Sequence, residues 1–266
     1  MKLIRYLKVT CMMLSSLVCN DLLIAQTNKF LSDWSMRRSY IAARQVFANT
    51  SSLSVKCRND YGLKELTDVR LTGIFVLEHN MLQASLSHYG YSRYGELWAE
   101  IAYSRNFSDK VGLSLRFYYL YGHASGYDAS HSVTFDVSLF LKASNKLAFW
   151  VDVYNPARMK YGIVGKELIP MSFLLGISYC YEDKLIFVVS MEKQLPGNFN
   201  ATFEFYYAPI QKLNFLCSLS LESVRVGFLL SLKNFNLSVD LGYQYNLGFI
   251  PELEATVLFD KFHYKK

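Results

Sequence analysis

The stretch "KVGLSLRFYYLYGHAS", residues 110–125, decides the fold. Apolar residues occupy every second position from Val111 to Tyr121, and a mixed set that includes Gly112, Ser114 and Arg116 stands between them. A period of two is typical of a β-strand with one apolar face and one mixed face. The apolar face must contact either the core of a soluble protein or the hydrocarbon of a membrane.

The same alternation recurs along most of the chain after residue 50. It is clearest over residues 95–106, 130–142, 146–154, 236–246 and 252–259. We expect about fourteen strands in all, most of them close to the 9–11 residues that a tilted strand needs to cross a bilayer. A helix is expected only over residues 32–49, before the first strand. The composition agrees, because the chain is 16% aromatic and aromatic residues favour strands.

The links between the expected strands alternate in length. Tight turns at "EHNM", "FSDK", "ASNK", "YEDK" and "KNFN" are rich in the residues that form turns. Longer links are expected between them, at residues 89–96, 121–130, 155–170, 194–200 and 246–252. Short turns at one end and long loops at the other are typical of a bacterial outer-membrane barrel.

The distribution of bulky and charged residues favours lipid over a soluble core. The mixed face carries large side chains beside its charges: Trp98, Tyr118, Trp150, Leu174 and Leu229. The apolar face is nearly free of charge, as expected where one charge at mid-bilayer would cost about 2–4 kcal/mol. Tyr and Phe stand at the ends of this face, as in the aromatic girdles of membrane barrels. The sequence therefore predicts an all-β transmembrane antiparallel barrel, with residues 111–121 facing lipid.

The first residues resemble an export signal. Lys2, Arg5 and Lys8 precede the apolar stretch "VTCMMLSSLVC", which is shorter than the about 20 residues of a spanning helix. We expect cleavage after Ala25; an uncleaved anchor and a lipid attached at Cys19 are the alternatives. The predicted organisation is a signal peptide at 1–25, an N-terminal segment at 26–50 and a barrel at 51–262, located in the bacterial outer membrane in contact with its lipid.

The lumen is expected to carry more acid than base. By alternation, the inward carboxylates are Glu96, Glu100, Asp136, Asp152, Glu192, Glu204, Glu222, Asp240 and Glu254, and the inward bases are Arg70, Arg116, Lys142 and Arg225. These charges either pair across the wall or line an acidic conduit. Arg37, Arg38 and Arg44 precede the first strand, and we expect residues 30–49 to enter the barrel as a plug, with these arginines pairing lumen carboxylates. A periplasmic tail is the alternative.

Other classes of function find little support. The net charge of +6 is scattered, without a basic helix or a run of lysines, which argues against nucleic-acid binding. His88 is expected on the lipid side, with Ser85 and Ser87 on the opposite face of the strand, so no catalytic group stands out. The loop "GHASGYDASH" lacks the tight ligand spacing of a metal site. We therefore expect no catalytic residue, no metal and no cofactor, and the chain is not expected to be an enzyme.

The segment "YGYSRYGELWAEIAYSRNFSDKVGLSLRFYYLY" followed by "VDVYNPAR" resembles the PorV/PorQ-like outer-membrane proteins, which are related to FadL-type channels and occur with type IX secretion. The resemblance includes a turn motif at Asn155, Pro156, Ala157 and Arg158. It implies a fourteen-stranded barrel and an accessory role in protein secretion or surface attachment, with secretion-apparatus proteins as partners. The N-terminal stretch "RRSYIAARQVFANTSS" lacks the Asn-Pro-Ala box of the family. A passive diffusion channel is the alternative function.

Overall fold

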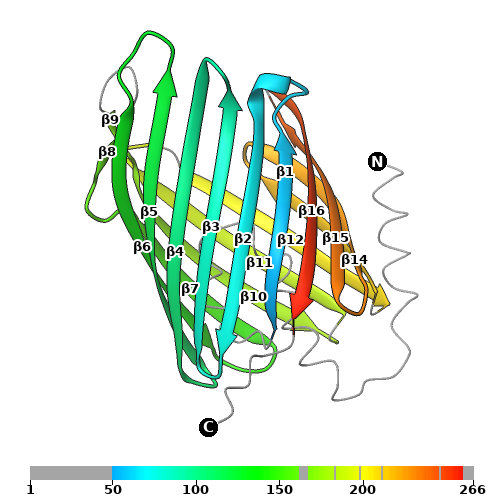
Figure 1. Cartoon of the computed structure of the whole chain (residues 1–266). Coiled ribbons are helices and arrows are strands. Elements are labelled where there is room, and N and C mark those ends of the chain that lie inside the picture. Colours follow the sequence, from blue (N-terminus) through cyan, green and yellow to red (C-terminus); the bar gives the residue numbers. More distant parts are fainter. Residues whose placement is uncertain are drawn as a thin grey trace.

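The computed structural model describes residues 50–161, 167–182, 184–197, 199–210, 212–245 and 247–259. Fourteen of its strands close into one antiparallel barrel, in which β1 pairs with β16 and every other strand pairs with the preceding and following strands of the wall (Figure 1). The predicted fold is confirmed. The signal peptide, the expected helix at 32–49 and the expected plug lie outside the described residues.

The wall strands have these bounds: β1 (Ser51–Asn59), β2 (Thr67–Leu77), β3 (Asn80–Tyr91), β4 (Tyr94–Ser108), β5 (Val111–Ala124), β6 (Ser130–Lys142), β7 (Leu147–Tyr154), β10 (Met171–Tyr181), β11 (Leu185–Leu195), β12 (Phe199–Ile210), β13 (Leu213–Ser220), β14 (Ser223–Ser231), β15 (Phe235–Gln244) and β16 (Gly248–Phe259). A short hairpin of β8 (Lys160–Tyr161) and β9 (Glu167–Leu168) lies in the connection from β7 to β10, and the 3-10 helix η2 (Lys64–Leu66) follows β1. Among the described residues, no helix is long and apolar enough to cross a membrane.

The two ends of the barrel differ in their connections. We call the end where β1 begins and β16 finishes the turn end, and the opposite end the loop end. The links from β2 to β3 and from β4 to β5, at residues 78–79 and 109–110, lie at the turn end and are tight, as predicted. The 155–170 connection is the longest at the loop end.

Three links that the sequence marked as long are short. β3 finishes at Tyr91 and β4 begins at Tyr94, and these two tyrosines are still paired across the hairpin. β11 ends at Leu195 and β12 begins at Phe199, and the link between β15 and β16 has the same length. Strand pairing extends into the Gly- and Tyr-rich segments that resembled loops, so the wall is taller than the alternation alone indicated.

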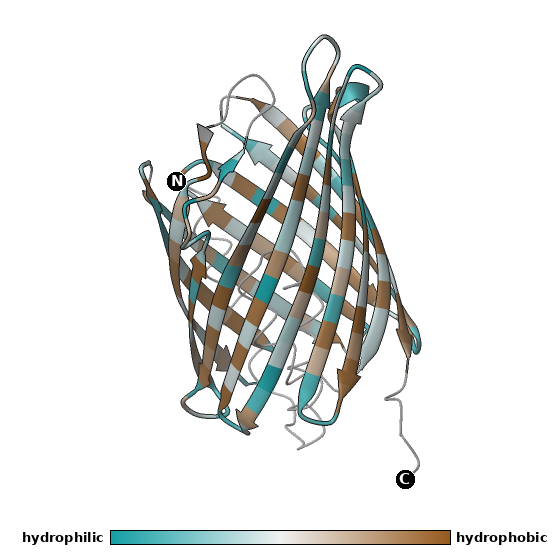
Figure 2. Ribbon diagram, turned by 60° about the vertical axis from the view of Figure 1, so that its left-hand side comes forward, coloured by the Kyte–Doolittle hydropathy of each residue, from teal (hydrophilic) through white to brown (hydrophobic). Residues whose placement is uncertain are grey.

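The outer face of the barrel is apolar. Large apolar residues point outward with exposed fractions between 45% and 64%, among them Leu71, Phe75, Ile101, Phe117, Leu175 and Phe228. Figure 2 shows the hydrophobic and hydrophilic residues alternating along the strands. Soluble proteins rarely expose contiguous apolar patches beyond a few hundred Å². The outward face is therefore the one predicted to contact lipid.

The inward face combines small polar residues with a few large ones. Ser52, Ser54, Ser104, Ser114 and Ser138 are buried on it, and Ser104 donates a hydrogen bond to Ser114 at 2.8 Å. Trp150 lies flat against the wall at Gly176, where an added Cβ would fall 2.1 Å from the indole ring. Glycine at this position therefore provides the space that the indole fills.

Candidate functional site

The lumen face of the barrel is the candidate site, because it gathers the polar side chains that the outer face lacks. The structure places Glu96, Glu100, Arg116, Asp136, Asp152, Arg225 and Asp240 on the inward positions of their strands. Of these, Arg116, Asp136, Asp152 and Asp240 are at most 5% exposed. In a closed barrel, residues on this face line whatever passes through.

Arg116 is the centre of a network on the wall formed by β3 to β7. Its Nε lies 3.3 Å from Glu100 Oε1, which also accepts a 2.6 Å hydrogen bond from Gln83. Arg116 donates to the Tyr118 hydroxyl at 3.3 Å, and Tyr118 donates to Asp136 Oδ2 at 2.5 Å. The guanidinium therefore compensates the charges of Glu100 and Asp136 within the wall.

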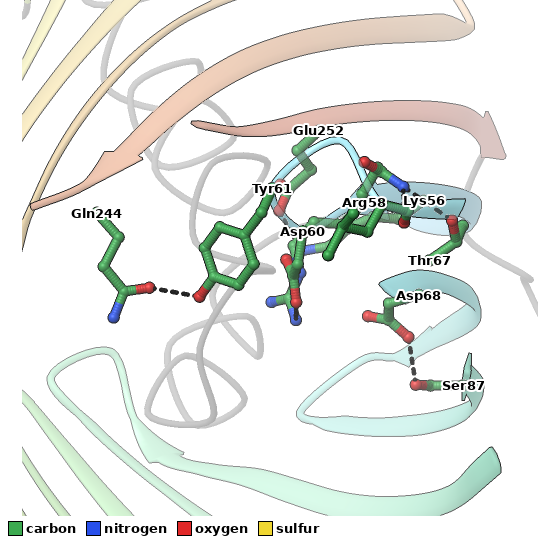
Figure 3. A network of polar contacts seen from close by, with 11 residues as sticks. Lys56, Arg58, Asp60, Tyr61, Thr67, Asp68, Ser87, Gln244 and Glu252 are labelled. Atoms are coloured by element: carbon green, nitrogen blue, oxygen red, sulfur yellow. Dashed lines mark hydrogen bonds and ion pairs between the residues drawn. The ribbon is translucent and has the colours of Figure 1, made fainter. Parts of the chain in front are cut away.

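The strand that opens the barrel contributes charges that the alternation missed. Lys56 Nζ on β1 lies 3.2 Å from Glu252 Oε2 on β16, and Asp68 accepts a 2.8 Å hydrogen bond from Ser87 (Figure 3). Lys56, Asp68 and Glu252 are all buried. Asp68 stands near the start of β2, where an alternating pattern is hardest to assign to a face, whereas Lys56 and Glu252 lie inside β1 and β16. Glu222 was wrongly expected inside, because it lies exposed in the link between β13 and β14.

The link after β1 folds over the loop end of the wall. Tyr61 has a positive φ of 63° and donates a 2.8 Å hydrogen bond from its hydroxyl to Gln244 at the end of β15 (Figure 3). Arg58 forms an ion pair with Asp60, its Nε 3.0 Å from Oδ1. The 60–66 link therefore reaches across β16 and connects β1 to β15.

A second group at the loop end surrounds Glu96 on β4. Tyr94 donates to Glu96 Oε1 at 2.5 Å, and the indole N–H of Trp98 donates to Oε2 at 3.3 Å. Tyr89 is the direct cross-strand partner of Glu96 on β3. Burial and the nearby Glu96 carboxylate raise the pKa of Tyr161, in β8, to about 12. We call Tyr89, Tyr94, Glu96, Trp98 and Tyr161 the Glu96 cluster.

Asn155, the first residue of the predicted turn motif, anchors the 155–170 connection. It is fully buried with a φ of 48°, and its Oδ1 accepts hydrogen bonds from Thr134 Oγ1 at 2.7 Å and from the Met159 amide at 2.9 Å. Its Nδ2 donates to the Ile169 carbonyl at 2.7 Å. The Arg158 amide donates to the Asn155 carbonyl at 3.0 Å, which closes a turn around Pro156 and Ala157. One amide side chain thus joins both ends of the longest connection to β6.

Toward the turn end, large apolar side chains replace the carboxylates on the inward face. Inward residues of strands β6 to β14 form one buried apolar cluster: Phe140, Ala148, Trp150, Leu174, Cys180, Ile186, Val188, Tyr206, Leu216 and Leu229. Ile74, Val76, Met81 and Ala102 form a smaller cluster on β2 to β4. The lumen face is therefore acidic and aromatic near the loop end and largely apolar near the turn end.

The expected plug arginines Arg37, Arg38 and Arg44 lie outside the described residues. Their expected partners are described, and two of these, Glu100 and Asp136, belong to the network of Arg116. The three cysteines of the described residues, Cys57, Cys180 and Cys217, are free thiols.

Comparison with known proteins identifies the fold and no family. No family model matches the chain, and no curated protein matches it. Among solved structures, it is similar to the CymD monoaromatic hydrocarbon channel, with a TM-score of 0.61, 10% identity, and 85% of this chain and 95% of that chain covered. It is also similar to the Pseudomonas putida toluene transporter TodX, with a TM-score of 0.57, 9% identity, and 84% and 92% covered. The KdgM porin matches with a TM-score of 0.47, 10% identity, and 78% and 99% covered. The chain thus has the fold of outer-membrane channel barrels, and membership of the PorV/PorQ-like family stays a prediction.

Proposed function

We propose that this protein is a non-enzymatic outer-membrane barrel through which small solutes diffuse passively. The observation that carries the proposal is the inversion of the barrel: the outer face is apolar, whereas carboxylates, arginines and hydroxyls line the inner face. Such a wall is stable in lipid and offers hydrogen bonds to a solute inside. CymD is a monoaromatic hydrocarbon channel and TodX is a toluene transporter, which supports a channel role here.

The described lumen also favours cations. The inward carboxylates are Asp68, Glu96, Glu100, Asp136, Asp152, Glu192, Glu204, Asp240, Glu252 and Glu254, and the inward bases are Lys56, Arg58, Arg70, Arg116, Lys142 and Arg225. Charges of one sign in excess within a channel concentrate counter-ions of the other sign. We therefore expect a channel that prefers small cations to anions of the same size.

Conductance in planar lipid bilayers tests the function. Full-length protein, added at low concentration, is expected to produce discrete current steps, with a reversal potential in a KCl gradient that shows preference for K⁺. Heat-denatured protein is the control. A membrane that stays silent while the inserted protein is folded would overturn the channel.

The resemblance through the "NPAR" turn supports a second candidate, an accessory of protein secretion or surface attachment. The specific observation is that this turn, through Asn155, orders the longest connection of the loop end, where a protein partner would dock. Affinity purification from outer membranes distinguishes the two functions. Secretion-apparatus proteins retained by the wild type, together with a silent bilayer, would favour the accessory role.

A further inference from the structure

Glu96 lacks the ion pair that two other lumen acids have in the described part of the chain. Glu100 is compensated by Arg116, and Glu252 is compensated by Lys56. Glu96 has hydrogen bonds from Tyr94 and Trp98, and within the described part of the chain no arginine or lysine forms an ion pair with it. A carboxylate in a partly buried site without a counter-charge is electrostatically unfavourable unless a cation can reach it.

Aromatic rings surround this carboxylate. Tyr94, Glu96 and Trp98 stand at alternate positions of β4 and so share its inward face, and Tyr89 pairs directly with Glu96 from β3. On the other side, the residue opposite Glu96 on β5 is Gly122, which has no side chain to cover the carboxylate. The arrangement leaves the β5 side of Glu96 uncovered by any side chain of its cross-strand partner.

Two side chains of the cluster are incompletely satisfied. Trp98 is 41% exposed, although its cross-strand partners Ser87 and Leu120 are buried on the same face. The Tyr161 hydroxyl is buried and has no hydrogen-bond partner among the described residues. A ligand that stacks on the indole and donates a hydrogen bond to this hydroxyl oxygen would contact both.

We infer that the Glu96 cluster binds organic cations in which an ammonium group is attached to an apolar body, and that these are solutes of the channel. The rings attract the cation through their electron-rich faces, each contact contributing about 0.5–2 kcal/mol, and Glu96 neutralises its charge. The apolar body then passes toward the apolar lining of Phe140, Trp150 and Leu174. This inference rests on the proposed channel function, whose solute class it names.

Calorimetric titration of the full-length protein in detergent tests the site without requiring conduction. The probe is benzyltrimethylammonium, and benzyl alcohol and methyl glucoside are the neutral comparisons. We expect the cation to bind at least tenfold more tightly than benzyl alcohol, and its affinity to fall as the salt concentration rises.

Three variants define the residues involved. Glu96→Gln keeps an acceptor for Tyr94 or Trp98 but removes the charge. Trp98→Leu removes the indole ring on which the cation would stack. Each variant is expected to weaken cation binding about tenfold, equivalent to about 1.4 kcal/mol. Glu222→Gln makes the same charge change at an exposed residue of the loop end and is expected to leave the affinity unchanged.

The outcomes separate the site from the function. Equal affinity for benzyltrimethylammonium and benzyl alcohol, or full binding by Glu96→Gln, would overturn the site. Tighter binding of methyl glucoside that is lost in Trp98→Leu would replace the cation with a sugar and overturn the inference as well. Selective cation binding in detergent with silent bilayers would leave the site standing and refute the channel instead.

Discussion

At the scale of single residues, the position of a side chain on one face of a strand decides what a substitution costs. Leu86 and Ser85 are neighbours near the middle of β3; Leu86 points outward and is 48% exposed, whereas Ser85 faces the lumen opposite Glu100. The two positions share backbone environment and depth in the wall. The same substitution at the two positions therefore isolates how the lipid-facing and lumen-facing sides of the strand differ in their effect on stability.

Leu86→Arg is expected to destabilise the barrel by about 2–4 kcal/mol, because it places a charge in hydrocarbon. Ser85→Arg places the same charge in the lumen beside Glu100 and is expected to cost much less. Urea midpoints of the two variants in lipid vesicles measure the difference. If the two midpoints coincide, the assignment of inner and outer faces is wrong.

Gly176 is a second residue whose role depends on its neighbour. An added methyl group would overlap the Trp150 ring, whereas at Gly242 the nearest atom to an added Cβ is 3.5 Å away. Gly176→Ala is expected to displace the indole, shift its fluorescence and destabilise the protein by about 1–3 kcal/mol. Gly242→Ala is the control and is expected to stay within about 1 kcal/mol of the wild type. An unchanged emission spectrum for Gly176→Ala would contradict the packing.

At the scale of elements, Asn155 determines the order of the 155–170 connection. Asn155→Ala removes the side-chain hydrogen bonds to Thr134, Met159 and Ile169, leaves buried groups unpaired at about 1–3 kcal/mol, and strains a residue with positive φ. We expect trypsin to cut faster after Arg158 and Lys160, which are exposed.

Asn155→Gly tolerates the same φ but lacks the hydrogen bonds, so it separates the two causes. If the hydrogen bonds dominate, Asn155→Gly and Asn155→Ala are cut at similar rates, while cleavage after Lys146, at the turn end, stays unchanged. Wild-type resistance in both variants would show that the amide does not anchor the connection.

The role of the N-terminal segment is a prediction from the sequence, because the segment lies outside the described residues. Its arginines, Arg37, Arg38 and Arg44, are predicted to pair with Glu100, Asp136, Asp152 or Asp240. Deleting residues 27–48 is then expected to widen a cation-preferring pore and lower the melting temperature. The same conductance and melting temperature in the deletion variant would favour a periplasmic tail.

At the scale of the whole molecule, strand number and closure could be predicted because alternation repeats along every strand of the wall and one face stays apolar throughout. Tyr61 and Tyr161 could not be placed, because the hydrogen bond of Tyr61 to Gln244 and the position of Tyr161 near Glu96 depend on links whose path the alternation does not determine. The ion pair of Lys56 with Glu252 could not be predicted either, because alternation within a strand does not give the register between the first strand and the last.

The antiparallel order predicts opposite sides of the membrane for Asn145 and Lys160. Asn145 lies in the turn between β6 and β7 at the turn end, and Lys160 in the connection at the loop end. With Cys57, Cys180 and Cys217 replaced by serine, a membrane-impermeant maleimide on intact cells is expected to label Lys160→Cys and to leave Asn145→Cys unlabelled. Label at position 145 and none at position 160 would invert the topology.

The seam between β1 and β16 joins the first and last strands of the wall, so the sheet cannot close until nearly the entire chain is available. Loop closure over such a separation is entropically costly, and a misaligned seam would be a kinetic trap. Lys56 stands opposite Glu254 and forms its ion pair with Glu252, next to Arg58. A slip of one residue would turn the charges of one strand toward the outer face, whereas a slip of two would keep an acid opposite a base. The buried charges of the seam thus disfavour every alignment that is shifted by an odd number of residues.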